Sequence, residues 1–368
     1  MNTKIKMQVP VPVSPSLEEV EEYKPGKLVK GAIKLSSNEN PLGPSPKVIR
    51  EIVESIEEGK LNLSVYPWGR KEEELRDEIL SYISLGVVKE NIVIGAGVDG
   101  VLDTLVKIFI ADDVVALIPI PTFSLYESLV KIAGGTPRYI KRKRGKDFSI
   151  PVKELISSYS ERTRMIFISS PNNPTGNCIS EDEVREIIES VPAAMVVIDE
   201  AYVEFADSSL VKLVTEYANV LILRTFSKAF GLAGLRVGYA VIPEWLASPY
   251  KKVSMPFSVN SIALTAAIAA LRDKEHLRRS VELVKHERPF LEENLQRFFT
   301  VYPSKANFVF VDVSPLKSYE VYDALMKKGI TVRDCSSFRG AGDSLIRITV
   351  GTREQNEKVV DVLKGISL

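Results

Sequence analysis

The sequence has few residues that could carry redox, metal or histidine chemistry. Of its 368 residues only two are cysteines, Cys178 and Cys335, and only two are histidines. Two cysteines cannot build a disulfide framework and are typical of a reducing compartment. Neither lies in a CxxC pair, so we expect no structural zinc and no other bound metal. His276 and His286 lie in charged helical stretches, which predicts that both are solvated surface residues.

The sequence also lacks an excess of one charge and a long hydrophobic run. Lysine plus arginine and aspartate plus glutamate each number 48, so the formal net charge is zero, which argues against a nucleic-acid-binding protein. No run of about 18 apolar residues is present, which argues against a membrane span. The first 13 residues contain two lysines but no apolar core of a secretory signal. We therefore expect a cytoplasmic protein with neither nucleic acid nor membrane as a partner.

Short apolar runs that alternate with amphipathic helices characterise the chain from residue 91 onward. The runs lie at 92–94, 114–120, 165–168, 195–198, 220–223 and 237–242. Such runs indicate strands buried on both faces, as in a parallel sheet with helices on each side. After residue 255 come helical stretches at 261–271 and 273–299, the second interrupted by Pro289, and strand-like runs at 308–313 and 345–350. We predict an α/β fold with a mostly parallel central sheet sandwiched by helices, and a smaller α+β domain.

The length of the chain and this change of pattern predict two domains and an N-terminal arm. We place the arm at 1–40, a large domain at 41–258 and a small C-terminal domain at 259–368. A helix is expected from Ser45-Pro46, a cap residue followed by a first-turn proline, to Gly59, and it could join the small domain. The basic run at 141–144 is interpreted as a solvated hairpin edge.

A glycine-rich turn, Gly95-Ala96-Gly97-Val98-Asp99-Gly100, follows a predicted strand and opens a helix. It matches the G-x-G-x-x-G dinucleotide fingerprint, which is a weak signal by itself. A dinucleotide site requires an acidic residue about 20 positions further on, but the next strand ends in Ile120-Pro121-Thr122, without an acid. Backbone N–H groups at a helix N-terminus can still bind one phosphate. The turn therefore predicts a phosphate site without a ribose site.

Polar residues follow three further predicted strands. They lie in Ser170–Gly176, Asp199–Tyr202 and Arg224–Lys228, and Arg236 follows eight residues after the last. Because the carboxyl ends of strands in an open α/β sheet converge on the ligand crevice, we expect these residues to face one site. A lysine, a carboxylate, a tyrosine, an asparagine and a phosphate loop suit pyridoxal phosphate. The lysine forms a Schiff base, the acid keeps the ring nitrogen protonated, and N–H groups with an arginine hold the phosphate.

Three of these stretches resemble those of the fold-type-I pyridoxal-phosphate aminotransferases. They are Asn173-Pro174-Thr175-Gly176, Asp199-Glu200-Ala201-Tyr202 and Ser227–Arg236. Further stretches resemble the histidinol-phosphate aminotransferases within that family. They are Tyr23–Lys27, Leu35–Pro44, Ser64–Pro67, Pro121–Ser124 and Arg347–Thr352. The resemblance extends over nearly the whole chain, and it implies the fold-type-I fold, pyridoxal 5'-phosphate as cofactor, and a homodimer with shared active sites.

The resemblance implies a role at the cofactor for each matching residue. Lys228 would bind the cofactor aldehyde and then shuttle a proton, and Asp199 would pair with the ring nitrogen. Asn173 and Tyr202 would form hydrogen bonds to the phenolic oxygen of the ring, and Phe123 would stack on its face. The cofactor phosphate would be held by Val98, Asp99, Gly100, Thr225, Ser227 and Arg236.

The resemblance also implies a substrate and a shared site. The reaction would be transamination of L-histidinol phosphate with 2-oxoglutarate, giving imidazole-acetol phosphate and glutamate in histidine biosynthesis. Tyr66 would complete the cofactor phosphate site of the partner subunit, and Tyr23 would reach the substrate phosphate across the dimer. Arg333, Arg347 and Asn40 would bind substrate, although the two arginines could instead form structural ion pairs.

The chain departs from the family at positions that bear on the substrate. Val98-Asp99-Gly100 stands where Ser-Asp-Glu is common, and Trp68-Gly69 replaces the usual Asp-Pro. A threonine-phosphate decarboxylase, or an aromatic or general amino-acid aminotransferase, therefore stays an alternative, and Val332–Ser336 fits the decarboxylase nearly as well. A regulator that only senses pyridoxal phosphate is an alternative of another class. Such proteins carry a fused DNA-binding domain, for which residues 1–40 are too short.

Overall fold

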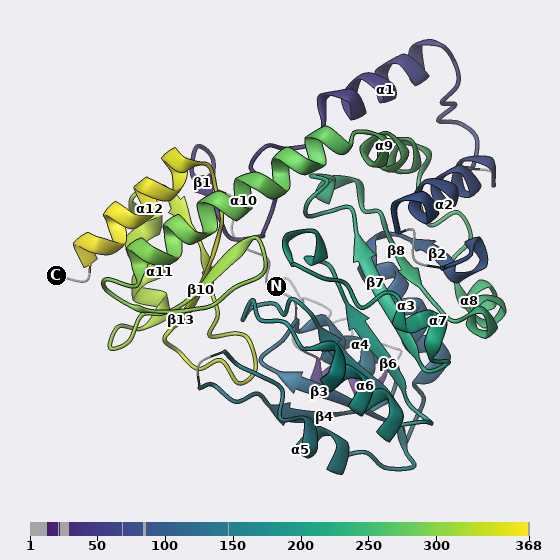
Figure 1. Ribbon diagram of the computed structural model, residues 1–368, viewed down its shortest axis with the longest axis horizontal. Helices are drawn as coiled ribbons and strands as arrows, with labels where there is room; N and C mark the ends of the chain where they lie inside the picture. Colours follow the sequence, from purple (N-terminus) through teal and green to yellow (C-terminus); the bar gives the residue numbers. More distant parts are fainter. Residues whose placement is uncertain are drawn as a thin grey trace, which may run out of the picture.

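A seven-stranded sheet forms the centre of the protein (Figure 1). The computed structural model describes residues 13–20, 22, 29–67, 69–83, 86–145 and 147–366. The strands, in sheet order, are β2 (Ile92–Gly95), β8 (Gly238–Val241), β7 (Val220–Thr225), β6 (Met195–Asp199), β5 (Thr163–Ser169), β3 (Val115–Ile120) and β4 (Thr136–Lys141). The five strands from β7 to β4 are parallel, and β8 is antiparallel to both of its neighbours. The predicted mostly parallel sheet is confirmed.

Helices cover both faces of this sheet, because successive side chains of each buried strand point to opposite sides. Ile166 and Ile168 of β5 belong to the hydrophobic cluster on one face, whereas Met165 and Phe167 belong to the cluster on the other. The first face is covered by α2 (Arg70–Ile83), α5 (Val152–Ser157), α6 (Glu181–Ser190), α7 (Leu213–Glu216) and α9 (Ser261–Arg272). The second is covered by α3 (Gly97–Phe109), α4 (Leu125–Ile132) and α8 (Ala247–Val253). In β3, β5, β6 and β7, polar side chains are consequently confined to the strand ends.

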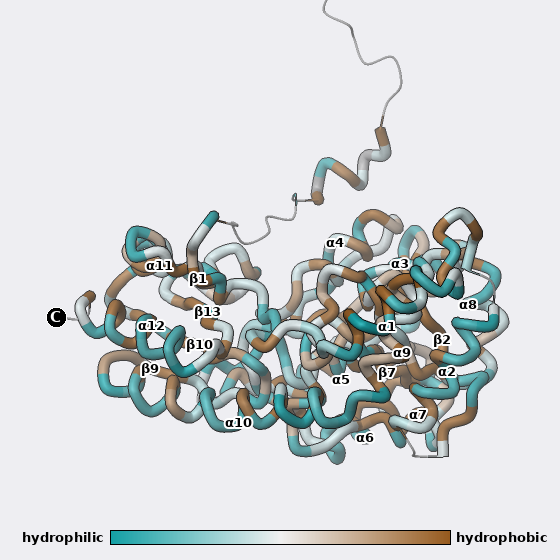
Figure 2. The backbone as a smooth tube through the Cα atoms, turned by 90° about the horizontal axis from the view of Figure 1, so that it is seen from above, coloured by the Kyte–Doolittle hydropathy of each residue, from teal (hydrophilic) through white to brown (hydrophobic). Residues whose placement is uncertain are grey.

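A second core stands beside the large sheet. Its antiparallel sheet has the order β12 (Arg333–Asp334), β13 (Leu345–Thr349), β10 (Phe308–Asp312) and β9 (Thr300–Tyr302). Its helices are α10 (Lys274–Leu295), α11 (Ser318–Lys327) and α12 (Arg353–Ile366). The short strand β1 (Ile33–Lys34) pairs in parallel with β11 (Ile330–Thr331), which ties residues 33 and 34 to this core. Figure 2 shows the two groups of elements side by side from above.

Helix α1 (Pro46–Glu57) begins and ends as the sequence predicts. The side chain of Ser45 accepts a hydrogen bond from the backbone N–H of Lys47, and Gly59 follows the helix with a φ of +68°. However, α1 packs against α9, and both belong to the core of the large sheet. The change from one core to the other therefore falls between α9 and α10, whereas the sequence prediction placed it at 258/259 and left α1 open to joining the small domain.

Pro289 does not interrupt its helix, contrary to prediction. Helix α10 runs without a break from Lys274 to Leu295, and in Figure 1 it passes from the side of α9 toward α12. Val284 and Leu291, on either side of the proline, are buried in the second core, so packing holds both halves of the helix in line.

Among the described residues, no helix combines the length and the apolar character that crossing a bilayer requires.

Two side chains that were predicted to be solvated are buried. Arg142, in the basic run, donates hydrogen bonds to backbone carbonyls, including that of Phe148 at 3.3 Å. The ring of His276 is also buried, with its Nε2 atom 3.1 Å from the carbonyl oxygen of Gly43. Buried carbonyl groups need donors, and these two side chains supply them. The second histidine is exposed, as predicted.

Candidate active site

A cavity of about 280 Å³ lies at the carboxyl ends of β5, β6 and β7, where the second core faces the large sheet. The strand ends contribute Ser169, Asp199 and Thr225 to its wall. Strands β12 and β13 contribute Arg333 and Arg347 from the opposite side. The cavity thus occupies the position at which open α/β sheets bind their ligands.

The cavity brings together most of the residues predicted to bind the cofactor or the substrate. Its wall contains Val98, Asp99, Phe123, Asn173, Asp199, Tyr202, Thr225, Ser227, Lys228, Arg236, Arg333 and Arg347. Gly100 is not in the wall but lies within the first turn of α3. Asn40 is also outside it, and its Nδ2 donates to the carbonyl of Ala229 at 2.9 Å and to Oγ of Ser280 at 2.8 Å, so its substrate-binding role stays a prediction. Tyr23 lies outside the described residues.

The amine of Lys228 is placed at the cavity by the turn that follows β7. Its Nζ donates to the carbonyl oxygen of Ser37 at 3.1 Å and lies 5.7 Å from the centre of the Tyr202 ring. Burial, together with the positive charge of Arg347, lowers the pKa of this amine to about 8. A large share of the amine is therefore neutral near pH 8, which makes Lys228 a competent nucleophile.

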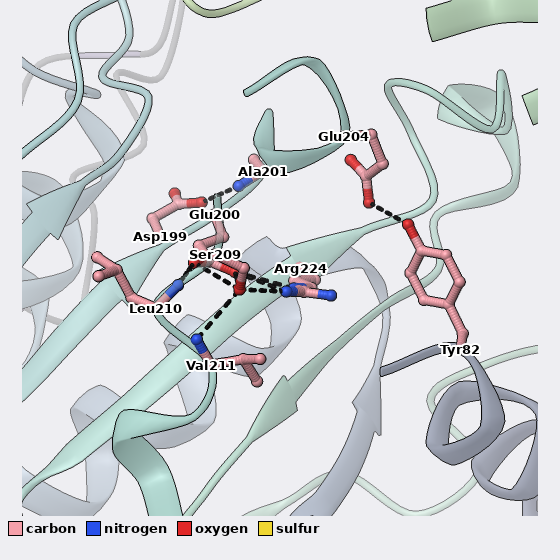
Figure 3. Close-up of polar contacts among 9 residues, drawn as sticks. All are labelled: Tyr82, Asp199, Glu200, Ala201, Glu204, Ser209, Leu210, Val211 and Arg224. Atoms are coloured by element: carbon pink, nitrogen blue, oxygen red, sulfur yellow. Dashed lines mark hydrogen bonds and ion pairs between the residues drawn. The ribbon is translucent and has the colours of Figure 1, made fainter. Parts of the chain in front are cut away.

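Asp199 ends β6 and is only 6% exposed. Its Oδ2 accepts a hydrogen bond from the hydroxyl of Tyr126 at 2.5 Å, and its Oδ1 accepts one from the backbone N–H of Ala201 at 2.9 Å (Figure 3 shows the second). Burial raises the pKa of this carboxyl to about 6. Both of these partners are neutral, and within the described part of the chain Asp199 forms no ion pair. A cationic N–H group in the cavity would therefore compensate its charge.

Tyr126 is the main site residue that sequence reasoning missed. Its ring is buried, stacked on Phe167 with 4.9 Å between ring centres, and lies edge-on to Phe123 at 5.7 Å. An aromatic residue in an amphipathic helix looks like ordinary core, so the residue type carried no signal. Phe123 precedes the helix, which begins at Leu125, so the three-residue spacing between Phe123 and Tyr126 carried no signal either.

Arg347 orients the side chain of Asn173. One of its Nη atoms donates to Oδ1 of Asn173, and the other donates to the carbonyl oxygen of Ser36 at 2.6 Å. The guanidinium carbon also lies 5.3 Å from the centre of the Phe308 ring. Since the guanidinium occupies the amide oxygen, the Nδ2 donor of Asn173 is directed away from Arg347.

The beginning of α3 and Arg236 form the polar end of the cavity. Arg236, whose φ is +52°, forms an ion pair with Asp99 at 2.7 Å, and its Nη1 lies 3.5 Å from Oγ of Ser227. Gly97 has a φ of +73°, and a Cβ atom there would lie 2.6 Å from the guanidinium of Arg236, so only glycine permits this close approach. Helix N–H groups, an arginine and the hydroxyls of Thr225 and Ser227 together suit a phosphate group.

A buried ion pair joins Glu200 and Arg224, which are neighbours in the sequence of residues in the cavity wall (Figure 3). Glu200 and Arg224 are 1% and 6% exposed, and two guanidinium nitrogens donate to one carboxylate oxygen at 2.9 and 3.0 Å. The hydroxyl of Ser209 contacts both partners, at 2.6 Å from the guanidinium. Because Glu200 follows Asp199 and Arg224 precedes Thr225, this network ties together two strand ends that carry cavity residues.

Tyr66 does not line the cavity of its own chain. It is 70% exposed and its ring stacks on Phe257, with 4.8 Å between ring centres. Leu63, Val65 and Met255 are exposed beside these two in the sequence. We call these five residues the Tyr66 patch.

In the part of the chain that the structure describes, no three His, Cys, Asp or Glu residues are arranged to hold a metal ion.

The chain is similar to aminotransferases in both sequence and structure. The sequence profile of the aminotransferase class I and II family matches residues 30–363. Histidinol-phosphate aminotransferase of Methanosarcina mazei is 48% identical over 354 residues, which cover 93% of each chain. That of Methanocaldococcus jannaschii is 38% identical over 91% of this chain and 89% of its own.

Solved structures of the same family have the same fold. The histidinol-phosphate aminotransferase from Clostridium acetobutylicum superposes with a TM-score of 0.83 at 28% identity, covering 91% of this chain and 99% of its own. The enzyme from Sinorhizobium meliloti, solved in complex with pyridoxal-5'-phosphate, has a TM-score of 0.83 at 22% identity, covering 96% of this chain and 98% of its own. At that identity the likeness supports the fold.

Proposed function

The chain belongs to the aminotransferase class I and II family, and from this premise we propose that it transfers the amino group of L-histidinol phosphate to 2-oxoglutarate with pyridoxal 5'-phosphate as cofactor. The choice of histidinol phosphate follows the similarity to the named relatives, and one observation in the cavity supports an anionic substrate. Arg333 and Arg347 lie directly opposite each other on β12 and β13, in the same cavity as Lys228. Like charges facing each other across two strands are unfavourable, and a bound anion offsets their repulsion.

The residues of the cavity fit pyridoxal phosphate. Asp199 is a buried carboxylate whose hydrogen-bond partners are neutral, which suits a protonated ring nitrogen. Lys228 presents an amine with a lowered pKa, and the polar end at Arg236 suits a phosphate. Asn173 and Tyr202 would bind the ring oxygen and Phe123 the ring face. The phosphate would be held by Thr225, Ser227, Arg236 and the first N–H groups of α3, at Val98, Asp99 and Gly100. When bound, the cofactor supplies an electron sink and carries the amino group between the two substrates.

The protein itself supplies the proton transfer and the orientation. The Nζ atom of Lys228 would accept the proton that leaves the substrate carbon and deliver it to the bound cofactor within the same half-reaction, and it would carry a proton in the opposite direction in the second half, a role that a pKa near the working pH favours. Asp199, fixed by Tyr126 and Ala201, holds its carboxylate in one orientation.

Two different anions must use the same site. Histidinol phosphate ends in a phosphate dianion and lacks a carboxylate, whereas 2-oxoglutarate carries two carboxylates. A planar guanidinium binds either group through two parallel hydrogen bonds. Arg347 and Arg333 therefore serve both half-reactions from one pair of positions, with Tyr23 of the partner's arm completing the phosphate site.

We also propose that the protein works as a cytoplasmic homodimer. The Tyr66 patch leaves five apolar or aromatic residues exposed on one chain, and such patches mark interfaces. α1 adds exposed Ile49, Val53 and Ile56. With this surface as the interface, Tyr66 would reach the cofactor phosphate of the partner subunit.

Product analysis tests this function. Purified protein loaded with cofactor is incubated with L-histidinol phosphate and 2-oxoglutarate, and the products are identified by mass spectrometry. We expect imidazole-acetol phosphate and glutamate in equal amounts. Release of carbon dioxide from threonine phosphate would identify a decarboxylase. Faster turnover of phenylalanine than of histidinol phosphate would identify an aromatic or general aminotransferase.

A further inference from the structure

Asn38 is a buried residue of the cavity wall that is held by the second core. It is 1% exposed and its φ is +56°, a left-handed conformation that asparagine adopts more readily than most other residues. Its backbone N–H donates to Oγ1 of Thr349 at 2.9 Å, and its carbonyl accepts from Nδ2 of Asn307 at 3.0 Å. Two residues of the second core therefore fix the backbone of Asn38 at the edge of the cavity.

Thr349 determines which way round the Asn38 amide lies. Because Oγ1 of Thr349 accepts the backbone N–H of Asn38, its own hydrogen is donated to Oδ1 of Asn38, at 3.2 Å. The other end of the amide, Nδ2, then faces the hydroxyl oxygen of Tyr202 at 2.9 Å. An amide nitrogen only donates, so the Tyr202 oxygen accepts this bond and its single hydroxyl hydrogen is directed to another partner.

We propose that Asn38 is a positioning residue that directs the hydroxyl hydrogen of Tyr202 toward the ring oxygen of the cofactor. The proposal rests on the proposed function, since that oxygen belongs to pyridoxal phosphate. Thr349 and Arg347 are two residues apart on β13 and share one face of it. Arg347 sets the amide of Asn173, and Thr349, through Asn38, sets the hydroxyl of Tyr202. Strand β13 thus orients both Asn173 and Tyr202 so that each can donate a hydrogen bond to the ring oxygen of the cofactor.

Asn38→Gly tests this role in the cofactor-loaded enzyme. Glycine keeps the positive φ and both backbone hydrogen bonds but removes the amide. The measurement is the pH titration of the absorbance of the bound cofactor. Loss of an oriented donor leaves negative charge on the ring oxygen less stabilised, so we expect the chromophore to bind a proton about tenfold more tightly. Tyr202→Phe should have the same effect.

A double-mutant cycle separates positioning from a general structural role. If Asn38 acts through the Tyr202 hydroxyl, Asn38→Gly should change nothing further in the Tyr202→Phe background. Asn91→Gly is the matched control, because Asn91 is also buried and bonds backbone groups, donating to Ile242 at 2.8 Å, but lies outside the cavity wall. It should leave the titration midpoint unchanged. Thr349→Val keeps asparagine at residue 38 but removes both the donor to its amide oxygen and the acceptor of its backbone N–H, and it should shift the midpoint in the same direction as Asn38→Gly.

Two outcomes would overturn the proposal. One is an unchanged midpoint in both Asn38→Gly and Thr349→Val, and Thr349→Val alone decides the matter if the glycine variant does not fold. The other is a shift of equal size with and without the Tyr202 hydroxyl. A wild-type protein that shows no cofactor absorbance after loading would instead remove the proposed function.

Discussion

The buried carboxylate of Asp199 lowers the free energy of unfolding of the cofactor-free protein at neutral pH. Burial raises the pKa of its carboxyl to about 6, above the value of about 3.9 in an unfolded chain. The folded state therefore binds more protons between these two values, and stability falls as the pH rises through this window. Above about pH 6 the full cost of the buried charge is present. A bound cation compensates that cost, which is what the proposed cofactor ring provides.

Asp199→Asn should consequently stabilise the cofactor-free protein. At pH 7.5 we expect the free energy of unfolding to rise by about 2 kcal/mol, and at pH 4 to change little, because the native carboxyl is then neutral. Urea unfolding of both proteins at the two pH values measures this. The same variant should lose several kcal/mol of transition-state stabilisation in turnover. A variant that is less stable than wild type at pH 7.5 would show that Asp199 serves the fold and not a ligand.

The two cross-strand arginines should differ in their effect on substrates. Arg333→Ala should lower kcat/KM for histidinol phosphate about tenfold or more while changing that for phenylalanine little, because only the dianion loses a charge-assisted pair. Arg347→Ala should lower both, since Arg347 also holds Asn173. Steady-state kinetics with each donor provides the comparison. If Arg333→Ala lowers both values by one factor, Arg333 is structural and a general aminotransferase becomes the better assignment.

For single residues of the site, the sequence predicted those that lie at the ends of strands. It missed those that reach the site from a helix or a loop. Lys228, Asp199 and Asn173 follow buried apolar runs, so their convergence could be derived from the topology of a parallel sheet. Tyr126 projects from a helix and Asn38 from a loop whose position depends on a pairing with the second core. No local pattern encodes such contacts.

Among the elements, the ends of β6 and β7 are tied by a buried ion pair. Arg224→Met leaves the buried carboxylate of Glu200 without its cationic partner, so we expect a loss of about 3 to 5 kcal/mol in the free energy of unfolding. The double variant Arg224→Met/Glu200→Met should recover most of that loss. Arg272→Met, which breaks an exposed pair with Glu78, is the control and should cost less than about 1 kcal/mol. Equal losses at the two arginines, measured by urea unfolding, would contradict this account of the network.

The element boundaries show where local pattern is enough and where packing decides. β5, β6 and β7 are continuous apolar runs, and their prediction is confirmed. β4 was missed because it is an edge strand in which exposed residues alternate with partly or fully buried ones, and its basic end looked like a solvated hairpin. Helix α9 is almost wholly apolar, which indicates that it is buried. This composition does not indicate in which of the two cores it is buried.

The whole molecule, on our proposal, is a dimer in which each cavity uses Tyr66 of the other subunit. Subunits carrying Lys228→Ala and subunits carrying Tyr66→Ala are then inactive or weak alone but complement each other. A heterodimer contains one site with both native residues, so an equal mixture that has exchanged subunits should regain about a quarter of wild-type activity. Activity is assayed after co-refolding. A mixture that is no more active than the mean of its parents would mean that Tyr66 does not act across the dimer.

The claim on which the rest depends is that pyridoxal phosphate binds covalently to Lys228. The direct measurement is to reduce the cofactor-loaded protein with sodium borohydride, digest it and map the labelled peptide by mass spectrometry. We expect a single pyridoxyl group on Lys228, loss of the yellow colour, and no label in Lys228→Ala. Because the neutral amine is the reactive form and burial lowers its pKa to about 8, loading should become faster as the pH rises toward 8. A protein that remains unlabelled, or is labelled on another lysine, would contradict the account.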